Sequence, residues 1–442
     1  MFALAAHGRE VETDDKGSKL EVSGFYKSLL SGVLLQPETV TGARALAKLT
    51  GSSTSIPDGG FVSAHLFRIN TKLLIREDLE LLCSWQLALS LASDPALLAG
   101  NTLSSTVGGT NTSGRRRIVE LGGTLGQGPT WRLDHSIDRL ALKFALPFAD
   151  VTVGRQVLSW GTGRVWNPTD LLSPFPPTVV DREVRRGFDA VRVAVPLGET
   201  GQLDLLYLLQ QDPADMGGVA RAQLNVLGWD GSISVGKYVD DLVFGADVVG
   251  DVGPIGVHAE GAYTVQLTGL KGGGPVGLGE HFFRGVISGE WKPLEHVVLM
   301  AEYSFNGYGT NDPSKLAGVL SSARVVRGEI FGGGMHQLAL AGVFTVNELL
   351  TAQVSVLGNL ADPSALVIPS VEYSLTPNVL LRAGAYVPLG RAPDATVFTS
   401  LGPLDVAMQS DAFRSAIASR GLKSEFGSSS FGGFAQVGVY LP

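Results

Sequence analysis

Residues 257–266 read VHAEGAYTVQ and alternate between two kinds of side chain. The odd-numbered positions are apolar or small, and the even-numbered positions are mostly polar, beginning with His258 and Glu260. Alternation with a period of two is typical of a β-strand that has one apolar and one polar face. The same pattern recurs before and after this stretch, so it predicts the fold of the whole chain.

Eighteen segments carry this strand pattern. Many of them run about ten residues or more, which is the length that a tilted strand needs to cross a bilayer. Strands of soluble proteins cluster near five or six residues. The predicted strands are 19–33, 60–74, 78–92, 130–147, 150–160, 188–197, 202–212, 219–229, 231–239, 241–250, 255–267, 281–292, 296–308, 335–346, 350–361, 364–375, 378–389 and 431–441.

The composition differs from that of an ordinary soluble domain. The chain has 442 residues, of which 44% are hydrophobic and 17% charged, and it contains 57 glycines. Soluble domains carry roughly 25% charged residues. The sequence has no apolar stretch of about 18 residues, which a spanning helix would need, and no linker-like segment divides it. We therefore expect a single domain over residues 19–442, preceded by a short N-terminal segment at 1–18.

Short turns and long loops alternate between the predicted strands. The connections between successive strands fall into two alternating sets, one for each rim of a barrel. All the long loops belong to the same set, and they lie at 34–59, 93–129, 161–187, 268–280, 309–334 and 390–430. Short turns on one rim and long loops on the other are typical of outer-membrane barrels. The predicted fold is an all-β, transmembrane, antiparallel up-and-down β-barrel of about 18 strands, with 16 as the alternative. The short turns are then periplasmic and the long loops extracellular, with helix signals at 313–329 and 410–421.

A soluble β-sandwich or β-solenoid is the alternative for a strand-rich chain. A sandwich of this length would need several domains with a linker, and a solenoid would need a fixed repeat; the sequence shows neither. Because lipid offers no water to unpaired peptide groups, strands can cross a bilayer only as a closed sheet. An apolar face that continues through all the strands therefore predicts closure.

The charges within the strands fall on the polar face and are predicted to point into the lumen. An arginine or lysine on the lipid face would cost about 2–4 kcal/mol at the midplane. Both charge signs are present, which favours a path for hydrophilic solutes over an ion filter of one sign. The predicted lumen-lining residues are Arg139, Lys143, Arg155, Arg192, Asp247, His258, Glu260, Arg284, Glu290, Glu302, Glu372 and Arg382.

Arg155 does not fit the alternation of its own strand. It shares a phase with Val151 and Val153, which are apolar. Either Arg155 lies at an interfacial end of the strand, or a bulge at Gly154 changes the phase. The alternation leaves both explanations open.

Residues 161–187 form a long loop that requires an explanation, because compact domains rarely contain such loops without a function. Four prolines stiffen it, and Gly161 and Gly163 allow tight turns. We predict that this loop folds into the barrel and narrows it; the alternative is a solvated extracellular loop. The predicted constriction residues are Arg164, Trp166, Asn167, Asp170, Asp181, Arg182, Glu183, Arg185 and Arg186.

The segment 154–174, GRQVLSWGTGRVWNPTDLLSP, combines Gly-Arg-Gln, Trp-Gly and Asn-Pro-x-Asp. In these features it resembles porin-like and alginate-export-like outer-membrane barrels of Gram-negative bacteria. The resemblance is confined to this segment, and it implies a channel or exporter with an inward loop. An alginate exporter would be expected to have a strongly cationic lumen, whereas the lumen predicted here is mixed in charge.

Other classes of function lack their sequence signals. The net charge is −8 and no basic run exceeds three residues, so no nucleic-acid-binding face is predicted. The single cysteine, Cys83, excludes a disulfide framework and a cysteine-based metal site. The seven histidines lie in no hydrolase or zinc motif, and a pair such as His258 and Glu260 is far more often a lumen hydrogen bond than a metal site. We predict no enzyme activity, no cofactor and no metal.

The sequence therefore predicts an outer-membrane channel for hydrophilic solutes, with saccharides or a polysaccharide among the candidates. The alternative is a non-conducting barrel that anchors partner proteins of a surface or export assembly, and a homo-oligomer is compatible with either. The expected surroundings are the lipids of the bacterial outer membrane, reached by export through the periplasm. Residues 3–6, ALAA, resemble the end of a signal peptide, which would then be truncated in this sequence; the alternative is an ordinary alanine-rich terminus.

Overall fold

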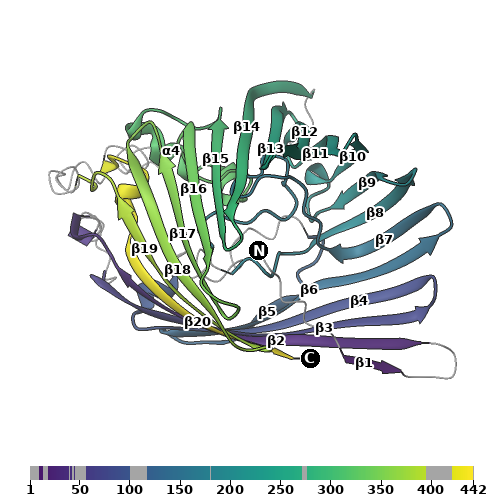
Figure 1. Ribbon diagram of the computed structural model, residues 1–442, viewed down its shortest axis with the longest axis horizontal. Coiled ribbons are helices and arrows are strands. Elements are labelled where there is room, and N and C mark those ends of the chain that lie inside the picture. Colours follow the sequence, from purple (N-terminus) through teal and green to yellow (C-terminus); the bar gives the residue numbers. More distant parts are fainter. Residues whose placement is uncertain are drawn as a thin grey trace.

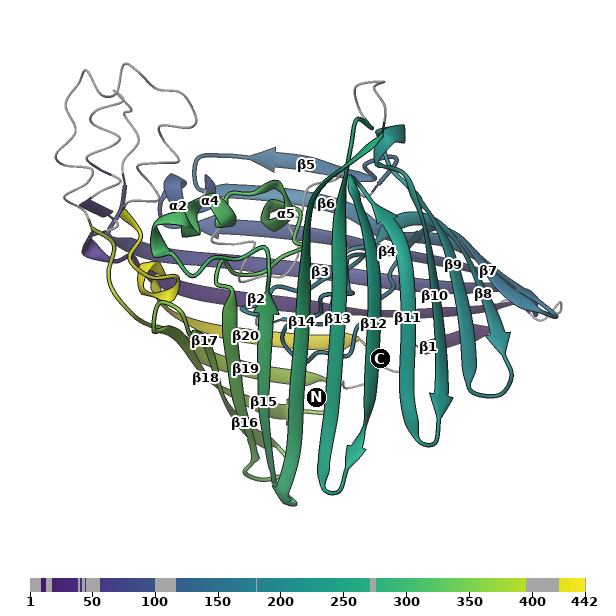
Figure 2. The same ribbon diagram turned by 90° about the horizontal axis from the view of Figure 1, so that it is seen from above.

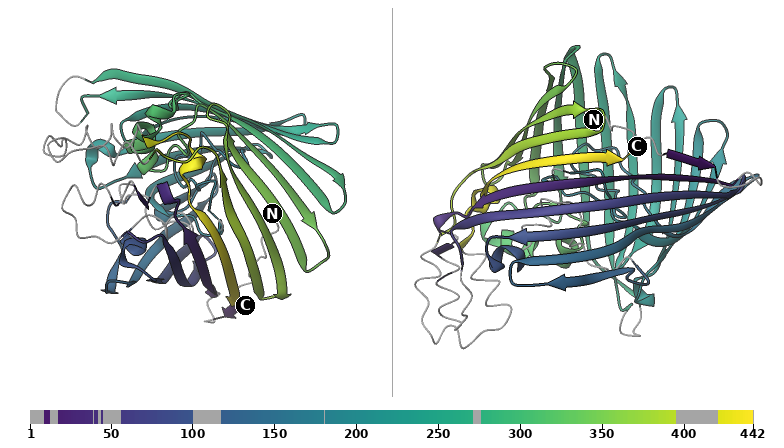
Figure 3. Two further views of the ribbon diagram at one scale, coloured as in Figure 1. Left: turned by 90° about the vertical axis from the view of Figure 1, so that its left-hand side faces the viewer. Right: turned by 90° about the horizontal axis from the view of Figure 1, so that it is seen from below.

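The computed structural model describes residues 9–12, 18–38, 40–41, 44, 56–99, 117–179, 181–270, 276–394 and 421–441. Eighteen antiparallel strands form a closed ring in which each strand pairs with the next along the chain, and β20 pairs with β2 to complete it (Figures 1 and 3). The closed all-β barrel and its number of strands are confirmed. No helix among the described residues has the length and apolar character needed to span a membrane.

The ring strands follow the predicted segments closely. They are β2 (Lys19–Leu34), β3 (Gly59–Arg76), β4 (Leu79–Ala92), β6 (Trp131–Leu146), β7 (Ala149–Gln156), β8 (Phe188–Leu197), β9 (Gly201–Leu209), β10 (Gly217–Val226), β11 (Trp229–Tyr238), β12 (Asp241–Val252), β13 (Ile255–Thr268), β14 (Gly277–Leu294), β15 (Val297–Asn306), β16 (His336–Thr345), β17 (Leu350–Asn359), β18 (Ser364–Thr376), β19 (Val379–Leu389) and β20 (Phe431–Leu441). Two further strands were not predicted. The four-residue β1 (Arg9–Glu12) pairs with the start of β2, and the glycine-rich β5 (Gly122–Gln127) pairs with β6 beyond the end of β7.

Short helices lie in the connections between strands. The predicted helix signal at 313–329 corresponds to η3 (Pro313–Lys315), α4 (Leu316–Leu320) and α5 (Ala323–Val326), and Asp312 caps η3. Figure 2 shows α4 and α5 near α2 (Pro95–Ala99), all at the same end of the barrel. The other predicted helix lies outside the described residues except for its last residue, and so does most of the segment 1–18.

Alternation along each strand separates an apolar outer face from a polar inner one. Tyr263 and Phe283 are opposite each other on β13 and β14, and their side chains are 41% and 47% exposed on the outer face. Thr264 and Glu302 lie on the inner face and are only 2% and 0% exposed. An exposed apolar belt around a buried polar interior is the arrangement that lipid requires of a spanning barrel.

The anomaly at Arg155 is resolved by a change of phase at Gly154, which has φ of +120°. Thr152 and Arg155 are three residues apart, yet both are buried, so the alternation is broken between them. Arg155 pairs with Asp189 on β8 at 2.7 Å. The predicted strand 150–160 is too long, because the chain leaves the sheet after β7 and turns into the lumen.

The two faces of β17 predict opposite responses to a charge. Val354 is 42% exposed on the outer face, whereas the next residue, Ser355, faces the lumen. Val354→Arg should destabilise the barrel by about 2–4 kcal/mol because it places a guanidinium in lipid, and Ser355→Arg should cost much less. Urea unfolding from lipid vesicles would measure both; equal losses would argue against a lipid-facing β17.

Candidate functional site in the lumen

Residues 157–187, here called the inward loop, connect β7 to β8 and cross the interior of the ring (Figure 1). Their hydrogen-bond partners lie on β13, β15, β19, β20 and β2, far around the ring from β7. A segment that leaves the sheet loses its ladder partners, and its buried peptide groups need others. Side chains of the lumen wall supply them.

Glu260 on β13 binds the first turn of the inward loop. Its carboxylate accepts hydrogen bonds from the backbone N–H groups of Thr162 at 2.7 Å, Gly163 at 3.2 Å and Thr169 at 2.6 Å. Gly161 has φ of +94°, and a Cβ at this position would lie 2.9 Å from the Glu260 carboxylate. The turn that presents these N–H groups therefore requires glycine.

Glu302 on β15 binds the next three residues. Its side chain is fully buried and accepts the backbone N–H groups of Arg164 at 2.7 Å, Val165 at 3.0 Å and Trp166 at 2.7 Å. Consecutive N–H groups that converge on one anion form a binding nest, and hydrogen bonds to charged groups contribute roughly 1.5–3 kcal/mol each. The position of the inward loop thus depends strongly on two wall carboxylates.

Two tryptophans anchor the apolar side of the inward loop. Trp160 is 4% exposed and packs in a cluster on β8–β13, while Trp166 is 6% exposed and packs in a second cluster on β14 and β16–β18. Burial of such large side chains contributes much of the packing energy of a segment. The first cluster includes Leu171, Leu172, Phe188, Leu206, Leu208 and Tyr238, and the second includes Val286, Ala339, Leu357 and Leu366.

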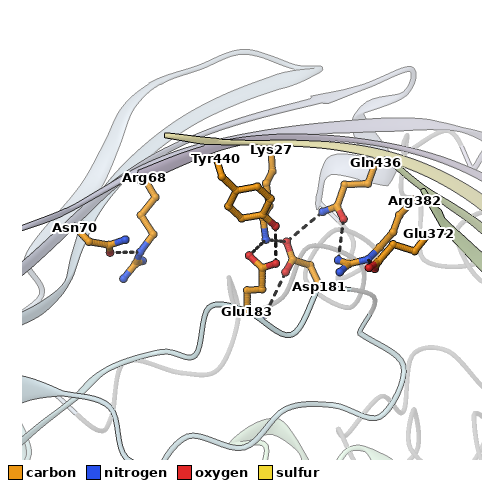
Figure 4. Close-up of polar contacts among 9 residues, drawn as sticks. All are labelled: Lys27, Arg68, Asn70, Asp181, Glu183, Glu372, Arg382, Gln436 and Tyr440. Carbon is orange, nitrogen blue, oxygen red and sulfur yellow. Dashed lines mark hydrogen bonds and ion pairs between the residues drawn. The ribbon is translucent and has the colours of Figure 1, made fainter. Parts of the chain in front are cut away.

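The far end of the inward loop is held by polar contacts to β2 and β20 (Figure 4). Lys27 Nζ lies 2.6 Å from the carboxylate of Asp181 and 2.5 Å from that of Glu183. Gln436 donates to Asp181 at 3.1 Å, and the Tyr440 hydroxyl donates to Glu183 at 2.5 Å. The loop is thereby fixed at both sides of the lumen.

The remaining predicted constriction charges make contacts within the inward loop or with β14. Arg185 pairs with buried Asp170 at 2.5 Å, and Arg164 reaches Glu290 on β14 at 3.0 Å. Arg182 donates to two backbone carbonyl oxygens of the loop. The Arg164 side chain is 48% exposed and that of Arg185 25%, so charge on the loop reaches the solvent of the lumen.

Burial and neighbouring charges act together on the titratable groups of the inward loop. Burial raises the pKa of the Asp170 carboxyl despite the opposing effect of Arg185. Burial would also raise the pKa of Asp181, but Lys27 and hydrogen bonds lower it below its usual range. Burial and nearby Arg117 lower the pKa of Arg186 to about 10. The stabilisation from Asp181 is therefore present above the unfolded pKa of about 4 and is lost as the pH falls through the lower folded value.

Six of the twelve predicted lumen-lining residues form ion pairs with charges on an adjacent strand or on the next strand but one. Arg155 pairs with Asp189, Arg192 with Asp204, Asp247 with Arg221, Lys143 with Asp150, and Glu372 with Arg382. Arg284 donates hydrogen bonds to the carbonyl oxygens of Pro168 and Glu329. His258 is buried, and Arg139 is partly buried on β6. The side chain of Asn167 lies beside Gly161 in the first turn of the inward loop. The wall is therefore mixed in charge. The part that these residues play in a pore stays a prediction.

Sequence reasoning missed a second set of contacts that covers the inner wall. Arg324 on α5 pairs with Asp241 at 2.8 Å, and Glu425 accepts the backbone N–H groups of Gly333 at 2.7 Å and Gly334 at 3.1 Å. The triplet of glycines at 332–334 was the available signal, because glycines leave N–H groups free to converge on a carboxylate. Their acidic partner lies too far along the sequence to be recognised from it.

No model of a protein family and no curated protein matches the sequence. Among solved structures, OccAB2 of Acinetobacter baumannii is similar with a TM-score of 0.52 at 7% identity, over 95% of this chain and 98% of that chain. The chain has the fold of a Gram-negative outer-membrane porin. OccK5 (OpdH) of Pseudomonas aeruginosa gives a TM-score of 0.49 at 9% identity over 95% of this chain and 98% of that one. OmpF of Salmonella typhi gives a TM-score of 0.44 at 11% identity, over 98% of this chain and 100% of that chain.

The nest around Glu302 predicts a local effect of its charge. Glu302→Gln keeps the shape but loses the anion, and it turns one amide N–H₂ toward N–H donors. Amide exchange at residues 164–166 should then rise by roughly tenfold or more. Glu290→Gln is the matched control, because a half-exposed ion pair contributes only about 0–1 kcal/mol. Hydrogen exchange with mass spectrometry would measure both, and equal protection in the two variants would contradict the assignment.

Proposed function

We propose that this protein is a channel of the outer membrane for small hydrophilic solutes and that the inward loop is its constriction. The observation that carries the proposal is the path of the loop, which is fixed to β13 and β15 on one side and to β2 and β20 on the other. An eighteen-stranded barrel is too wide for its own side chains to fill. A loop fixed across such a lumen sets the width and the charge of the remaining path.

The solute class follows from the polarity of the lumen. Positive and negative side chains pair along the wall, so no single sign dominates over a long distance. This arrangement favours neutral or weakly charged hydrophilic solutes, including saccharides, over polyanions. Hydroxyl and amide groups such as those of Ser136, Asn70 and Gln86 lie on the partly exposed wall of β3, β4 and β6, where they suit sugar hydroxyls.

A non-conducting barrel is the second candidate, and the burial of the inner wall favours it. Gln337, Asn359 and Glu302 are 1%, 2% and 0% exposed beneath the loops. Such coverage is what a barrel that presents loops to a partner protein would also have. Conduction separates the two candidates.

Conduction by the purified protein is the direct test. Refolded barrel added to a planar lipid bilayer should produce discrete conductance steps. Retention of the folded form in cold detergent on a gel is the control for the barrel itself. A folded protein that gives no steps in any salt or at any voltage would overturn the channel and leave the anchoring barrel.

The exposed charge of Arg164 should contribute to ion selectivity. Arg164→Gln removes a half-exposed cation from the inward loop, so the anion-to-cation permeability ratio should fall by about twofold. Arg132→Gln is the control, because Arg132 is equally exposed at 52% but lies at the outer end of β6. Reversal potentials in a salt gradient would measure the ratio. A larger change in the control would place the selective region elsewhere.

A further inference from the structure

The seam of the barrel is the contact between β2 and β20, which lie side by side in Figure 3. It runs from the pair Gly24 and Leu441 to the pair Leu34 and Phe431. Every other pair of neighbours in the ring is joined directly by the chain segment between them, and such connections help to set strand register. The two seam strands come from opposite ends of the sequence. Their register can therefore be set only by contacts between the two strands and with residues that lie next to them.

Glycines weaken the register of this seam. Lys27 is opposite Gly438, and Gly32 is opposite Gly433, so these pairs lack cross-strand side-chain contact. A slip of one residue would turn the apolar face of β20 inward, but a slip of two residues would keep both faces in place. The outer residues Val437, Val439 and Leu441 are similar in character and would tolerate that slip. The pattern of polarity alone therefore does not fix how the barrel closes.

The inward loop makes contacts that do distinguish the two registers. Asp181 accepts from Lys27 on β2 at 2.6 Å and from Gln436 on β20 at 3.1 Å. Glu183 accepts from Lys27 at 2.5 Å and from Tyr440 on β20 at 2.5 Å. Each carboxylate thus binds both seam strands at once, from inside the barrel (Figure 4).

The geometry of these bonds is specific for one register. The position opposite Lys27 lies midway between Gln436 and Tyr440, whose side chains point to the same face. A slip of two residues would move both β20 donors by about 6.8 Å relative to Lys27, well beyond hydrogen-bond reach of about 3.2 Å. Lys27 is 3% exposed, and a buried ammonium that loses its carboxylates is strongly unfavourable.

We propose that Asp181 and Glu183 join β2 to β20 from within the lumen and fix the register at which the barrel closes. The two acids are positioning residues for the seam, and Lys27 is the shared donor. The cross-linking test below does not depend on conduction, so the proposal can fail while the channel stands, and the channel can fail while the proposal stands.

Disulfide cross-linking across the outer face of the seam tests the register. In a Cys83→Ser background, Ser28→Cys with Val437→Cys reports the native pairing, because these residues are opposite each other. Ser28→Cys with Val439→Cys reports a slip of two residues. After refolding and mild oxidation, the native pair should form at least roughly ten times more disulfide than the slipped pair.

Removal of the two carboxylates should change that ratio. Asp181→Asn with Glu183→Gln should raise the slipped product by roughly tenfold or more. Arg164→Gln with Glu290→Gln is the matched control, because it removes an ion pair from the other end of the inward loop and should leave the ratio unchanged. An unchanged ratio in the double variant, or an equal rise in the control, would overturn the proposal.

A milder variant keeps the test informative if the double variant does not fold. Tyr440→Phe removes only the hydroxyl that links β20 to Glu183, and the slipped product should rise severalfold. Tyr26→Phe is its control, because Tyr26 lies on β2 with its hydroxyl bonded to His65, away from the inward loop. If the two tyrosine variants give the same ratio as the parent, the inward loop does not set the register.

Discussion

The structure depends on one constraint, which is that peptide groups surrounded by lipid must all be hydrogen-bonded to each other. Helices of sufficient length are not present among the described residues, and the strands meet the constraint by closing into a ring. Closure places one face of every strand in lipid, and alternation then places the other face around a wide lumen. The polar content of the chain is a consequence of this geometry, because half of each strand never meets the bilayer.

The same constraint acts a second time inside the lumen. The inward loop has left the sheet, so its peptide N–H groups have no ladder partners, yet the loop is buried. Glu260 and Glu302 provide the acceptors from the wall, and Glu425, which precedes η4 (Phe426–Ser428), accepts the N–H groups of Gly333 and Gly334 in another loop. Carboxylates suit this role better than neutral acceptors because each can accept several N–H groups at once. Glu260, Glu302 and Glu425 therefore hold backbone in place, whereas other acids of the lumen, such as Asp247 and Glu372, pair with arginines of the wall.

The sequence was sufficient to predict the eighteen ring strands, because alternation and turn signals are local properties of the chain. It failed for β1 and β5, which are too short or too rich in glycine to alternate. It also failed to decide the orientation of Arg155, because a single residue with positive φ at Gly154 changes the phase. The acidic and basic residues of the inward loop could be named, but their partners could not. Glu183 meets Tyr440 across 257 positions of sequence, and no periodicity connects such positions.

The contacts of the inward loop also determine which charges a solute could meet. A charge that is buried and paired, such as Asp181 with Lys27, is neutralised at short range and contributes little to the field in the lumen. Arg164 and Glu183 retain side-chain exposures of 48% and 34%, so their fields extend into water before salt screens them over about 8–10 Å. The two residues differ in sign and lie on one loop. In the proposed channel, these two partly exposed charges of opposite sign would act on a passing solute more strongly than the buried pairs do, and neither sign of ion would be excluded.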